Sequence, residues 1–286
     1  MRLGKGIELN LRDVWFEYTP SKPVIKGVSI SVRGERIGIV GQNGSGKTTL
    51  LSILMGFQRP KVGDVMINGI NPWKQRERVV KAFNPAFEKA RLPYAMKVGE
   101  FVKVVGRANG DPEGTSALAD ELGLSKFELQ KVSSLSSGQE QLLWIFSALA
   151  DSSRIPVLDE PFVHLDLHSY VRVSSVLRRR FHSYILTSHI PEDVELLADS
   201  VIVLEQGRVI WYGKVRELQE DGDVYDVFIN GTVPPLEGVL GDFGNILVVR
   251  AEGETLKRLM EEGKILGYKR SGVRYVYVKA NGENLR

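Results

Sequence analysis

Residues 41–48 have the types and spacing of a loop that binds phosphate. The segment reads Gly-Gln-Asn-Gly-Ser-Gly-Lys-Thr and fits the pattern G-x-x-x-x-G-K-S/T. Its glycines let the backbone wrap around a phosphate chain without Cβ clashes. N–H groups of the loop and of the following helix N-terminus direct positive partial charge at that chain. Lys47 would reach the β- and γ-phosphates of a nucleotide, and Thr48 would offer its hydroxyl to Mg²⁺.

Three further reactive side chains follow two apolar segments downstream. Asp159 and Glu160 come directly after residues 155–158, and His189 follows residues 183–188. Asp159 could hold a metal ion through its coordination shell, and Glu160 could polarise an attacking water. A histidine at the end of a strand parallel to the phosphate-loop strand would point toward the ligand crevice. The pattern predicts nucleotide hydrolysis.

Two other signals are weaker when taken alone. In the segment 135–139, Leu-Ser-Ser-Gly-Gln, Ser137 and Glu140 fit the S-x-x-E pattern of a capping box. A helix N-terminus there could bind an anion, but a simple helix cap is the more economical interpretation. Tyr18 could stack on a purine, although an ordinary strand aromatic is the preferred interpretation when the residue is taken alone.

The segments around these residues predict an α/β nucleotide-binding domain. An apolar strand at 36–40 leads into the loop and a helical pattern at 48–56 follows it. The other elements expected in this half are strands at 7–18, 28–32, 63–68, 155–158 and 183–188, helices at 98–105, 113–122, 126–131 and 166–181, and a hairpin over 201–212.

The composition changes near residues 220–223, and a domain boundary is expected there. Residues 1–220 form the nucleotide-binding domain, and residues 221–286 form a small α+β module without a catalytic constellation. The module is expected to contain strands at 224–229, 245–250 and 273–279 and a helix at 254–262.

The composition excludes several classes of function. With 38 basic and 35 acidic residues, the net charge of +3 is too small to argue for nucleic acid. The absence of cysteine excludes disulfides, thiol catalysis and cysteine–metal sites. Residues 1–10 lack the apolar core of a signal peptide, and the apolar run 142–150 is too short to span a bilayer. A membrane role would therefore require a partner.

Together, these motifs resemble the ATP-binding cassette (ABC) ATPases over residues 7–218, and in particular the subunits of exporter-like transporters with a C-terminal extension. The resemblance rests on the Walker A loop (41–48), the signature (135–139), the Walker B strand with its glutamate (155–160), the D-loop (162–166) and the switch histidine His189. No N-K-x-D motif for guanine follows the Walker B strand, which disfavours a GTPase.

The resemblance implies a RecA-like core, an antiparallel β-subdomain and a helical subdomain near residues 86–150. ATP and Mg²⁺ would lie between two such domains facing head to tail, so the chain would form a homodimer, or a heterodimer with another ABC ATPase. ATP hydrolysis would power transport through a separate permease, at the cytoplasmic face of the cell membrane. No nucleic acid would take part.

The resemblance also assigns roles to single residues. Glu160 would act on water, Lys47 would hold the phosphates and His189 would sense the γ-phosphate, while Thr48 and Asp159 would hold Mg²⁺. Ser136 and Gly138 of the other copy would close on the γ-phosphate. The full set of ATP contacts implied is Tyr18, Gly41, Asn43, Gly44, Ser45, Gly46, Lys47, Thr48, Thr49, Ser136, Gly138, Gln139 and Asp166.

The chain departs from the family pattern at three positions. Ser137 replaces the second signature glycine, and His164 occupies the D-loop position before Leu-Asp that usually holds a small residue. Ala86 falls where the Q-loop glutamine is expected, with Glu88 as a nearby substitute. In the family this glutamine contacts Mg²⁺ and couples the site to the permease, so its absence leaves open a regulatory module that binds nucleotide without hydrolysis. A soluble ABC ATPase outside transport is the other alternative.

Overall fold

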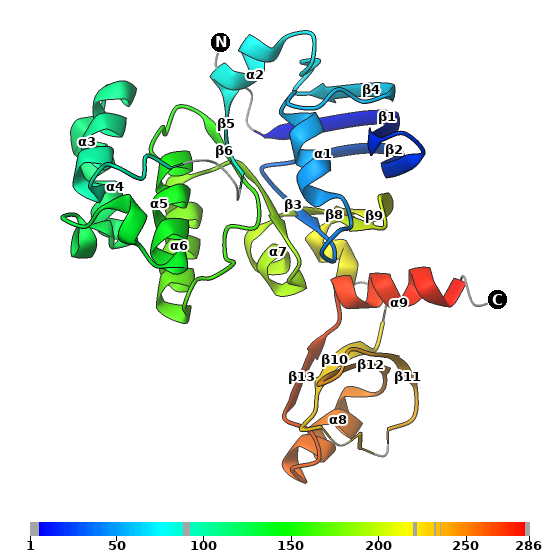
Figure 1. Cartoon of the computed structure of the whole chain (residues 1–286). Helices are drawn as coiled ribbons and strands as arrows, with labels where there is room; N and C mark the ends of the chain where they lie inside the picture. Colours follow the sequence, from blue (N-terminus) through cyan, green and yellow to red (C-terminus); the bar gives the residue numbers. More distant parts are fainter. Residues whose placement is uncertain (1–5, 88–91, 220–221, 232, 235, 284–286) are drawn as a thin grey trace. The chain divides into compact units, whose positions relative to one another are not determined.

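A computed structural model describes residues 6–87, 92–219, 222–231, 233–234 and 236–283 of the chain (Figure 1). Its internal contacts divide the chain into two units, Met1–Val209 and Ile210–Arg286. The first unit holds every motif named above. The second is a separate α+β module.

A six-stranded sheet lies at the centre of the first unit, in the order β5-β6-β7-β3-β8-β9. Strand β3 pairs in parallel with β7 and β8, and β6 pairs in parallel with β5 and β7. The carboxyl ends of these strands therefore meet at one edge, which is where ligands bind in such sheets. The strand bounds are Phe83–Ala86 (β5), Ile155–Leu158 (β6), Tyr184–Ser188 (β7), Arg36–Val40 (β3), Ser200–Glu205 (β8) and Arg208–Lys214 (β9).

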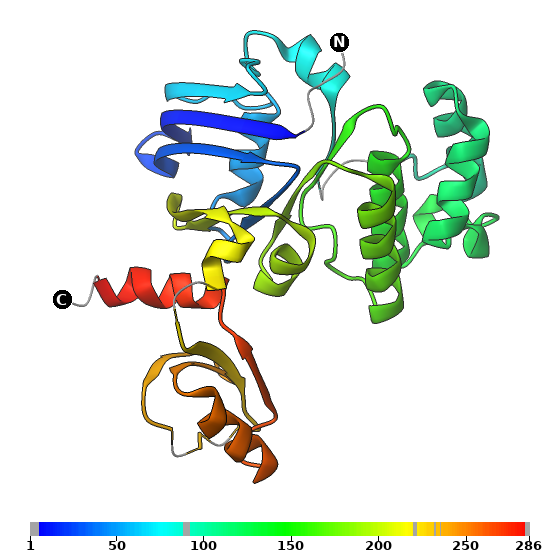
Figure 2. The same ribbon diagram turned by 180° about the vertical axis from the view of Figure 1, so that it is seen from behind.

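An antiparallel sheet of order β2-β1-β4 covers helix α1 (Lys47–Leu54) (Figure 1; Figure 2). Its strands are β1 (Ile7–Thr19), β2 (Lys22–Gly34) and β4 (Val62–Ile67). Alternate residues of β1 and β2 share one hydrophobic core with the apolar face of α1 and with the central strands. Helix α1 is thus fixed between two sheets. A further helix, α2 (Arg76–Ala82), precedes β5.

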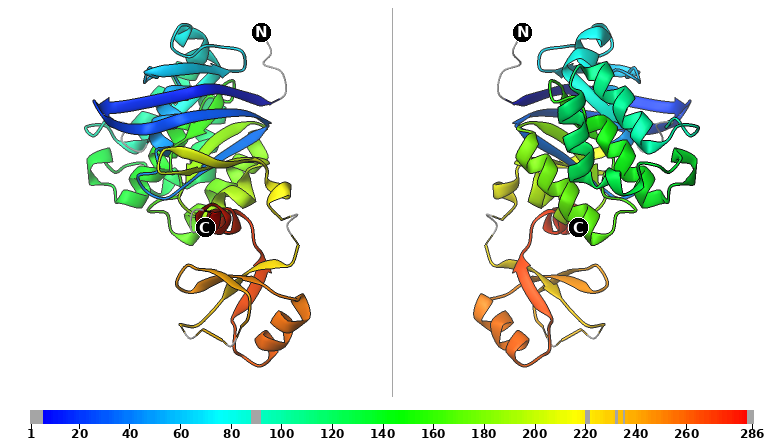
Figure 3. Two further views of the ribbon diagram at one scale, coloured as in Figure 1. Left: turned by 90° about the vertical axis from the view of Figure 1, so that its right-hand side faces the viewer. Right: turned by 90° about the vertical axis from the view of Figure 1, so that its left-hand side faces the viewer.

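The remaining helices of the first unit lie outside the central sheet, and those at residues 98–122 lie farther from it than those at residues 137–149 and 167–180 (Figure 1; Figure 3). They are α3 (Val98–Asn109), α4 (Pro112–Leu122), α5 (Ser137–Leu149), α6 (Leu167–Arg180) and α7 (Pro191–Leu197). The helix expected at 126–131 is wrong, because the chain instead forms 3₁₀ turns at Leu124–Phe127 and Val132–Ser134. Gly123, with φ 79°, ends α4, and a 3₁₀ turn places Leu124 and Phe127 on one buried side.

The second unit is a four-stranded antiparallel sheet of order β11-β12-β10-β13 with one helix on each face (Figure 1). Helix α8 packs on the face that carries Val227 and Val249, and α9 packs on the face that carries Val224 and Val248. The bounds are Val224–Phe228 (β10), Val239–Asp242 (β11), Ile246–Arg250 (β12), Gly253–Glu261 (α8), Gly267–Arg270 (β13) and Val273–Glu283 (α9).

The strand expected at 273–279 is wrong, since this segment lies in helix α9. Its alternation of valine and tyrosine favours a strand by local propensity, but a tertiary requirement overrides it. β13 already forms the edge of the sheet, and the face with Val224 and Val248 must be covered. Tyr275 of α9 packs on both valines. Strands β11 and β13 were not expected from the sequence, because neither shows a clear apolar alternation.

Candidate functional site

The phosphate loop follows β3 and is shaped by glycines. Gly44 and Gly46 have φ values of 81° and 106°, which side chains other than glycine rarely tolerate. A Cβ atom on Gly41 would lie 2.3 Å from the carbonyl oxygen of Leu204. The Gly41 N–H donates to the carbonyl oxygen of Ser188 at 3.2 Å, which ties the loop to the end of β7. The loop is therefore preformed to approach a phosphate chain closely.

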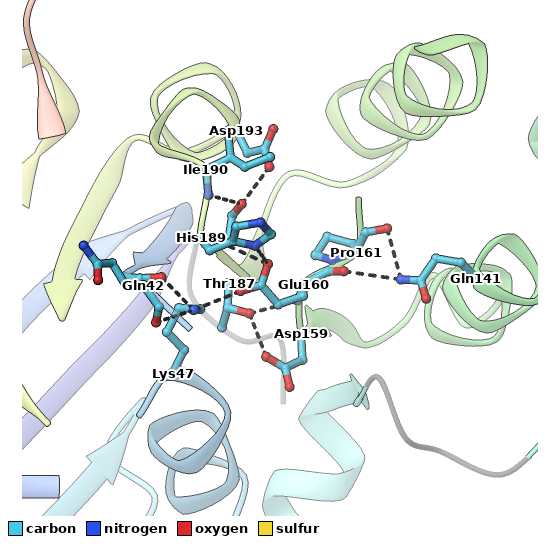
Figure 4. Close-up of polar contacts among 12 residues, drawn as sticks. Gln42, Lys47, Gln141, Asp159, Glu160, Pro161, Thr187, His189, Ile190 and Asp193 are labelled. Atoms are coloured by element: carbon cyan, nitrogen blue, oxygen red, sulfur yellow. Dashed lines mark hydrogen bonds and ion pairs between the residues drawn. The ribbon is translucent and has the colours of Figure 1, made fainter. Parts of the chain in front are cut away.

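Lys47 is buried at the start of α1 and makes three polar contacts (Figure 4). Its ammonium donates to the carbonyl oxygens of Gly41 at 2.7 Å and Gln42 at 3.1 Å. It also forms an ion pair with Glu160, with Nζ to Oε1 at 3.0 Å. Both side chains are largely desolvated, so solvent screens the attraction between them less than it would at the surface. The Lys47 cation is thus held at the mouth of the glycine loop.

The other predicted residues of this loop differ in exposure. Asn43 and Thr48 are exposed, whereas Ser45 and Thr49 are buried. The Thr49 hydroxyl lies 3.3 Å from the Tyr18 hydroxyl, which brings the end of β1 to the loop helix. Tyr18 is 59% exposed, and its ring contacts Phe16 edge-on. More than half of the Tyr18 surface is therefore accessible.

Asp159 and Glu160 follow β6 and share Thr187 of β7 (Figure 4). The Thr187 hydroxyl donates to Asp159 Oδ1 at 2.7 Å and accepts the Glu160 N–H at 2.9 Å. Glu160 has a φ of 50°, a backbone conformation that costs about 1–3 kcal/mol outside glycine. Neighbouring bonds must therefore hold Glu160 in this conformation. Thr187, which the sequence reasoning passed over as part of a strand, supplies one of them.

The Glu160 carboxylate lies between a cation and an imidazole. Oε1 faces Lys47. Oε2 accepts the backbone N–H of His189 at 3.2 Å and lies 2.9 Å from the ring nitrogen Nδ1 of the same residue. With the proton on Nδ1, the ring donates to the carboxylate and leaves Nε2 on its outer side. Three side chains that are far apart in sequence thus form one cluster, as predicted from the ends of the parallel strands.

The signature segment begins helix α5 with a capping box, but not the one predicted. Ser136 is the N-cap: its hydroxyl accepts the Gln139 N–H at 3.4 Å, and Gln139 Oε1 accepts the Ser136 N–H at 3.0 Å. The prediction from Ser137 and Glu140 is wrong by one residue, because Ser136 is extended and Ser137 is already helical. At the third helical position of a capping box, a glutamine side chain can accept the N-cap N–H as a glutamate side chain does.

Two contacts connect the signature to the rest of the site. Gln141 Nε2 donates to the carbonyl oxygens of Glu160 at 3.3 Å and Pro161 at 3.2 Å. A Cβ atom on Gly138 would lie 2.8 Å from the carbonyl oxygen of His164, so the D-loop passes directly over this glycine. Sequence reasoning missed Gln141, because it ends a polar stretch and nothing in that stretch distinguishes it. Asp166 caps α6 by accepting the Ser169 N–H at 2.7 Å.

The position of the expected Q-loop glutamine carries no oxygen ligand in its side chain. Ala86 is buried at the end of β5, and its carbonyl oxygen accepts the Asp159 N–H at 3.1 Å. Glu88, the other candidate, lies outside the described residues. The Ala86 side chain itself therefore supplies no magnesium ligand.

The Thr48 hydroxyl and the Asp159 carboxylate fit magnesium by their chemistry. Both are hard oxygen donors, and Mg²⁺ is usually held by one or two protein groups together with waters and substrate phosphates. Within the described ranges, no group of three or more histidine or acidic side chains forms a complete metal cage. A magnesium ion here would share its coordination with the phosphates. No helix in the same ranges is long and apolar enough to cross a membrane.

Comparison with known proteins agrees with this geometry. The family model for ABC transporters matches residues 25–163. A putative ABC transporter ATP-binding protein of Pyrococcus abyssi is 35% identical over 222 residues, which are 73% of this chain and 84% of that protein. The ABC transporter ATP-binding protein NatA of Bacillus subtilis is 30% identical over 225 residues, which are 74% of this chain and 92% of that protein.

A solved structure supports the same assignment. The ATP-binding subunit of an ABC transporter superposes with a TM-score of 0.64 at 25% identity, over 74% of this chain and 92% of that one. The chain therefore belongs to the ABC transporter family as an ATP-binding subunit, an ATPase coupled to transport. The predicted α/β ABC ATPase fold is confirmed.

Proposed function

We propose that Glu160 activates water for ATP hydrolysis in this subunit, with Lys47 and His189 as its partners. The observation that carries the proposal is the position of the Glu160 carboxylate, 3.0 Å from Lys47 Nζ and 2.9 Å from His189 Nδ1. A carboxylate within hydrogen-bond reach of an imidazole is oriented for acid–base work. Contacts with Lys47 and His189 fix the position of the Glu160 carboxylate, which a base needs in order to act on one water molecule.

Binding of ATP would change the partners of Lys47. The β- and γ-phosphates carry more negative charge than one carboxylate and would compete for the ammonium group. Glu160 would then be released from Lys47 while His189 still holds its other oxygen. The loop N–H groups would neutralise the remaining phosphate charge, and Tyr18 would stack on the adenine. The lysine–glutamate pair would therefore keep the site ordered until phosphate replaces the carboxylate.

Thr48 and Asp159 are proposed to hold Mg²⁺, which would neutralise charge on the β- and γ-phosphate oxygens. In the same proposal, residues 1–220 bind nucleotide and residues 221–286 are an accessory module. Ser136 and Gly138 would complete the site of a second copy facing head to tail, with Gln139 and Asp166 beside them. The cap at Ser136 supports this role, because it fixes the N-terminus of α5, an end that favours anions.

The proposed partner is a membrane-spanning permease, bound at the cytoplasmic face of the membrane. The second ATPase would be an identical copy or a homologous subunit. Export by this transporter stays a prediction, since the C-terminal module carries no sharp motif for either direction.

ATP turnover by the full chain tests the role of Glu160. Glu160→Gln keeps the shape of the side chain but removes the base, so turnover should fall by at least about 100-fold while ATP binding persists. Glu113→Gln, an exposed carboxylate in the first turn of α4, is the matched control and should turn over like wild type. Turnover by Glu160→Gln at the wild-type rate would refute the assignment.

A further inference from the structure

Two polar side chains beside the site have no part in the mechanism above. Asp193 lies in α7 and is only 4% exposed, and Tyr170 lies in α6 and is partly buried. Burial is the main cause that raises the pKa of Asp193 above its ordinary value. Burial and the Asp193 charge raise the pKa of Tyr170 to about 12, so its hydroxyl stays protonated and can donate. A buried acid of this kind needs a reason for its position.

Asp193 holds the backbone turn that carries His189 (Figure 4). The Ser188 hydroxyl donates to Asp193 Oδ2 at 2.6 Å and accepts the Ile190 N–H at 3.0 Å. Ser188 and Ile190, which flank His189, are therefore connected to Asp193 by hydrogen bonds. Through its carbonyl oxygen, Ser188 also accepts the Gly41 N–H. Asp193 thus acts on the position of His189 without contacting the imidazole.

Tyr170 connects the same acid to the D-loop. Its hydroxyl interacts with the Asp193 carboxyl group. Its ring packs on Phe162, with ring centroids 4.7 Å apart and ring planes at 50°. Phe162 is buried and is the first residue of the D-loop, two positions after Glu160. These interactions link the D-loop through Tyr170, Asp193 and Ser188 to the His189 turn.

We propose that Tyr170 and Asp193 are positioning residues that couple the D-loop to His189. A shift of Phe162 would move Tyr170, change its contact with Asp193 and release or tighten the turn that holds His189 against Glu160. The inference rests on the proposed role of Glu160 and His189 in hydrolysis. It adds a path within one chain by which the D-loop, on the partner-facing side in the proposed dimer, reports to the catalytic carboxylate.

Amide hydrogen exchange of the full chain tests the coupling without using activity. Tyr170→Phe keeps the ring but removes the hydroxyl, and Phe162→Leu removes the aromatic contact. Both should raise exchange at residues 188–190 by about tenfold, because the Ile190 N–H depends on the bound Ser188 hydroxyl. Val171→Ala, on the exposed side of α6, is the matched control and should leave exchange there unchanged. Unchanged exchange in both test variants would overturn the proposal.

A double-mutant cycle on ATP turnover separates positioning from a general structural role. Asp193→Ala should lower kcat by about tenfold with little change in KM, yet by less than about twofold in the His189→Ala background. Asp193→Asn retains an acceptor for Ser188 and should restore most of the rate. Equal losses in both backgrounds would refute the coupling. If His189→Ala alone turned over normally, the proposed function would fail and this inference with it. A slowed but measurable His189→Ala beside a normal Asp193→Ala would refute only the inference.

Discussion

Replacing Thr187 by valine should damage the site without touching the nucleotide loop. Thr187 is fully buried, and its hydroxyl both donates to Asp159 and accepts the N–H of Glu160. Valine has nearly the same shape but no hydroxyl. The variant therefore leaves a buried carboxylate without one donor and a buried N–H without its acceptor.

The cost of this change follows from those two groups. An unsatisfied buried polar group costs about 1–3 kcal/mol, and a hydrogen bond to a charged group contributes about 1.5–3 kcal/mol. A loss of about 2–4 kcal/mol in the free energy of unfolding is expected, or roughly 5–15 °C in Tm for a domain of this size. The strained Glu160 backbone, at φ 50°, would also relax. Because such strain is about 1–3 kcal/mol, the competent conformation should become about 5- to 150-fold rarer.

Thermal unfolding and ATP turnover of purified protein check both effects. Thr187→Val should lower Tm and kcat together, while its affinity for ATP should stay close to that of wild type because the phosphate loop is intact. Thr187→Ser is the matched control, since it keeps the hydroxyl and loses only a methyl group. A wild-type kcat for Thr187→Val, or equal damage from Thr187→Ser, would refute the reasoning.

Three further changes test other parts of the molecule. Ser136→Arg should retain ATP binding but abolish ATP-dependent dimerisation in size-exclusion chromatography; an unchanged dimer would count against the head-to-tail arrangement. Asp226→Ala should destabilise the C-terminal unit by about 3–5 kcal/mol in denaturant unfolding, because the buried carboxylate pairs with Arg274 at 2.8 Å; ATP turnover should persist. Hydrogen bonds from Arg180 hold the pKa of Glu121 below its ordinary 4.5, so this stabilisation is present above that pH and lost as pH falls through the folded-state pKa. Glu121→Gln should therefore cost under about 1 kcal/mol at neutral pH and nothing in acid, and a loss that persists in acid would contradict this.

The sequence predicted the nucleotide-binding fold because each of its signals is local. One short segment, residues 36–56, contains the apolar strand, the glycines of the phosphate loop and the helix that follows. The ends of parallel strands then bring Lys47, Glu160 and His189 together, and this juxtaposition is the one present in the structure. A capping signal was also visible, although the capping box predicted from Ser137 and Glu140 lies one residue away from the one at Ser136 and Gln139.

Predictions failed where long-range packing decides the local structure. Residues 273–279 alternate as a strand does, yet they form a helix because an exposed sheet face needs a cover. Nothing within the segment itself records that requirement. The same limit explains why β11 and β13 were missed, since their pairing partners lie in β12 and β10.

The supporting residues of the site were invisible for a related reason. Thr187 and Gln141 make their important bonds across 27 or 28 and 19 or 20 positions of sequence, respectively. A buried threonine in a strand and a glutamine in a helix have no local signature. Their role appears only in the folded chain, where Thr187 and Gln141 both bond to residues 159–161 after the Walker B strand. Because such groups hold Glu160 in a strained conformation, variants of these residues should slow hydrolysis markedly although no sequence motif contains them.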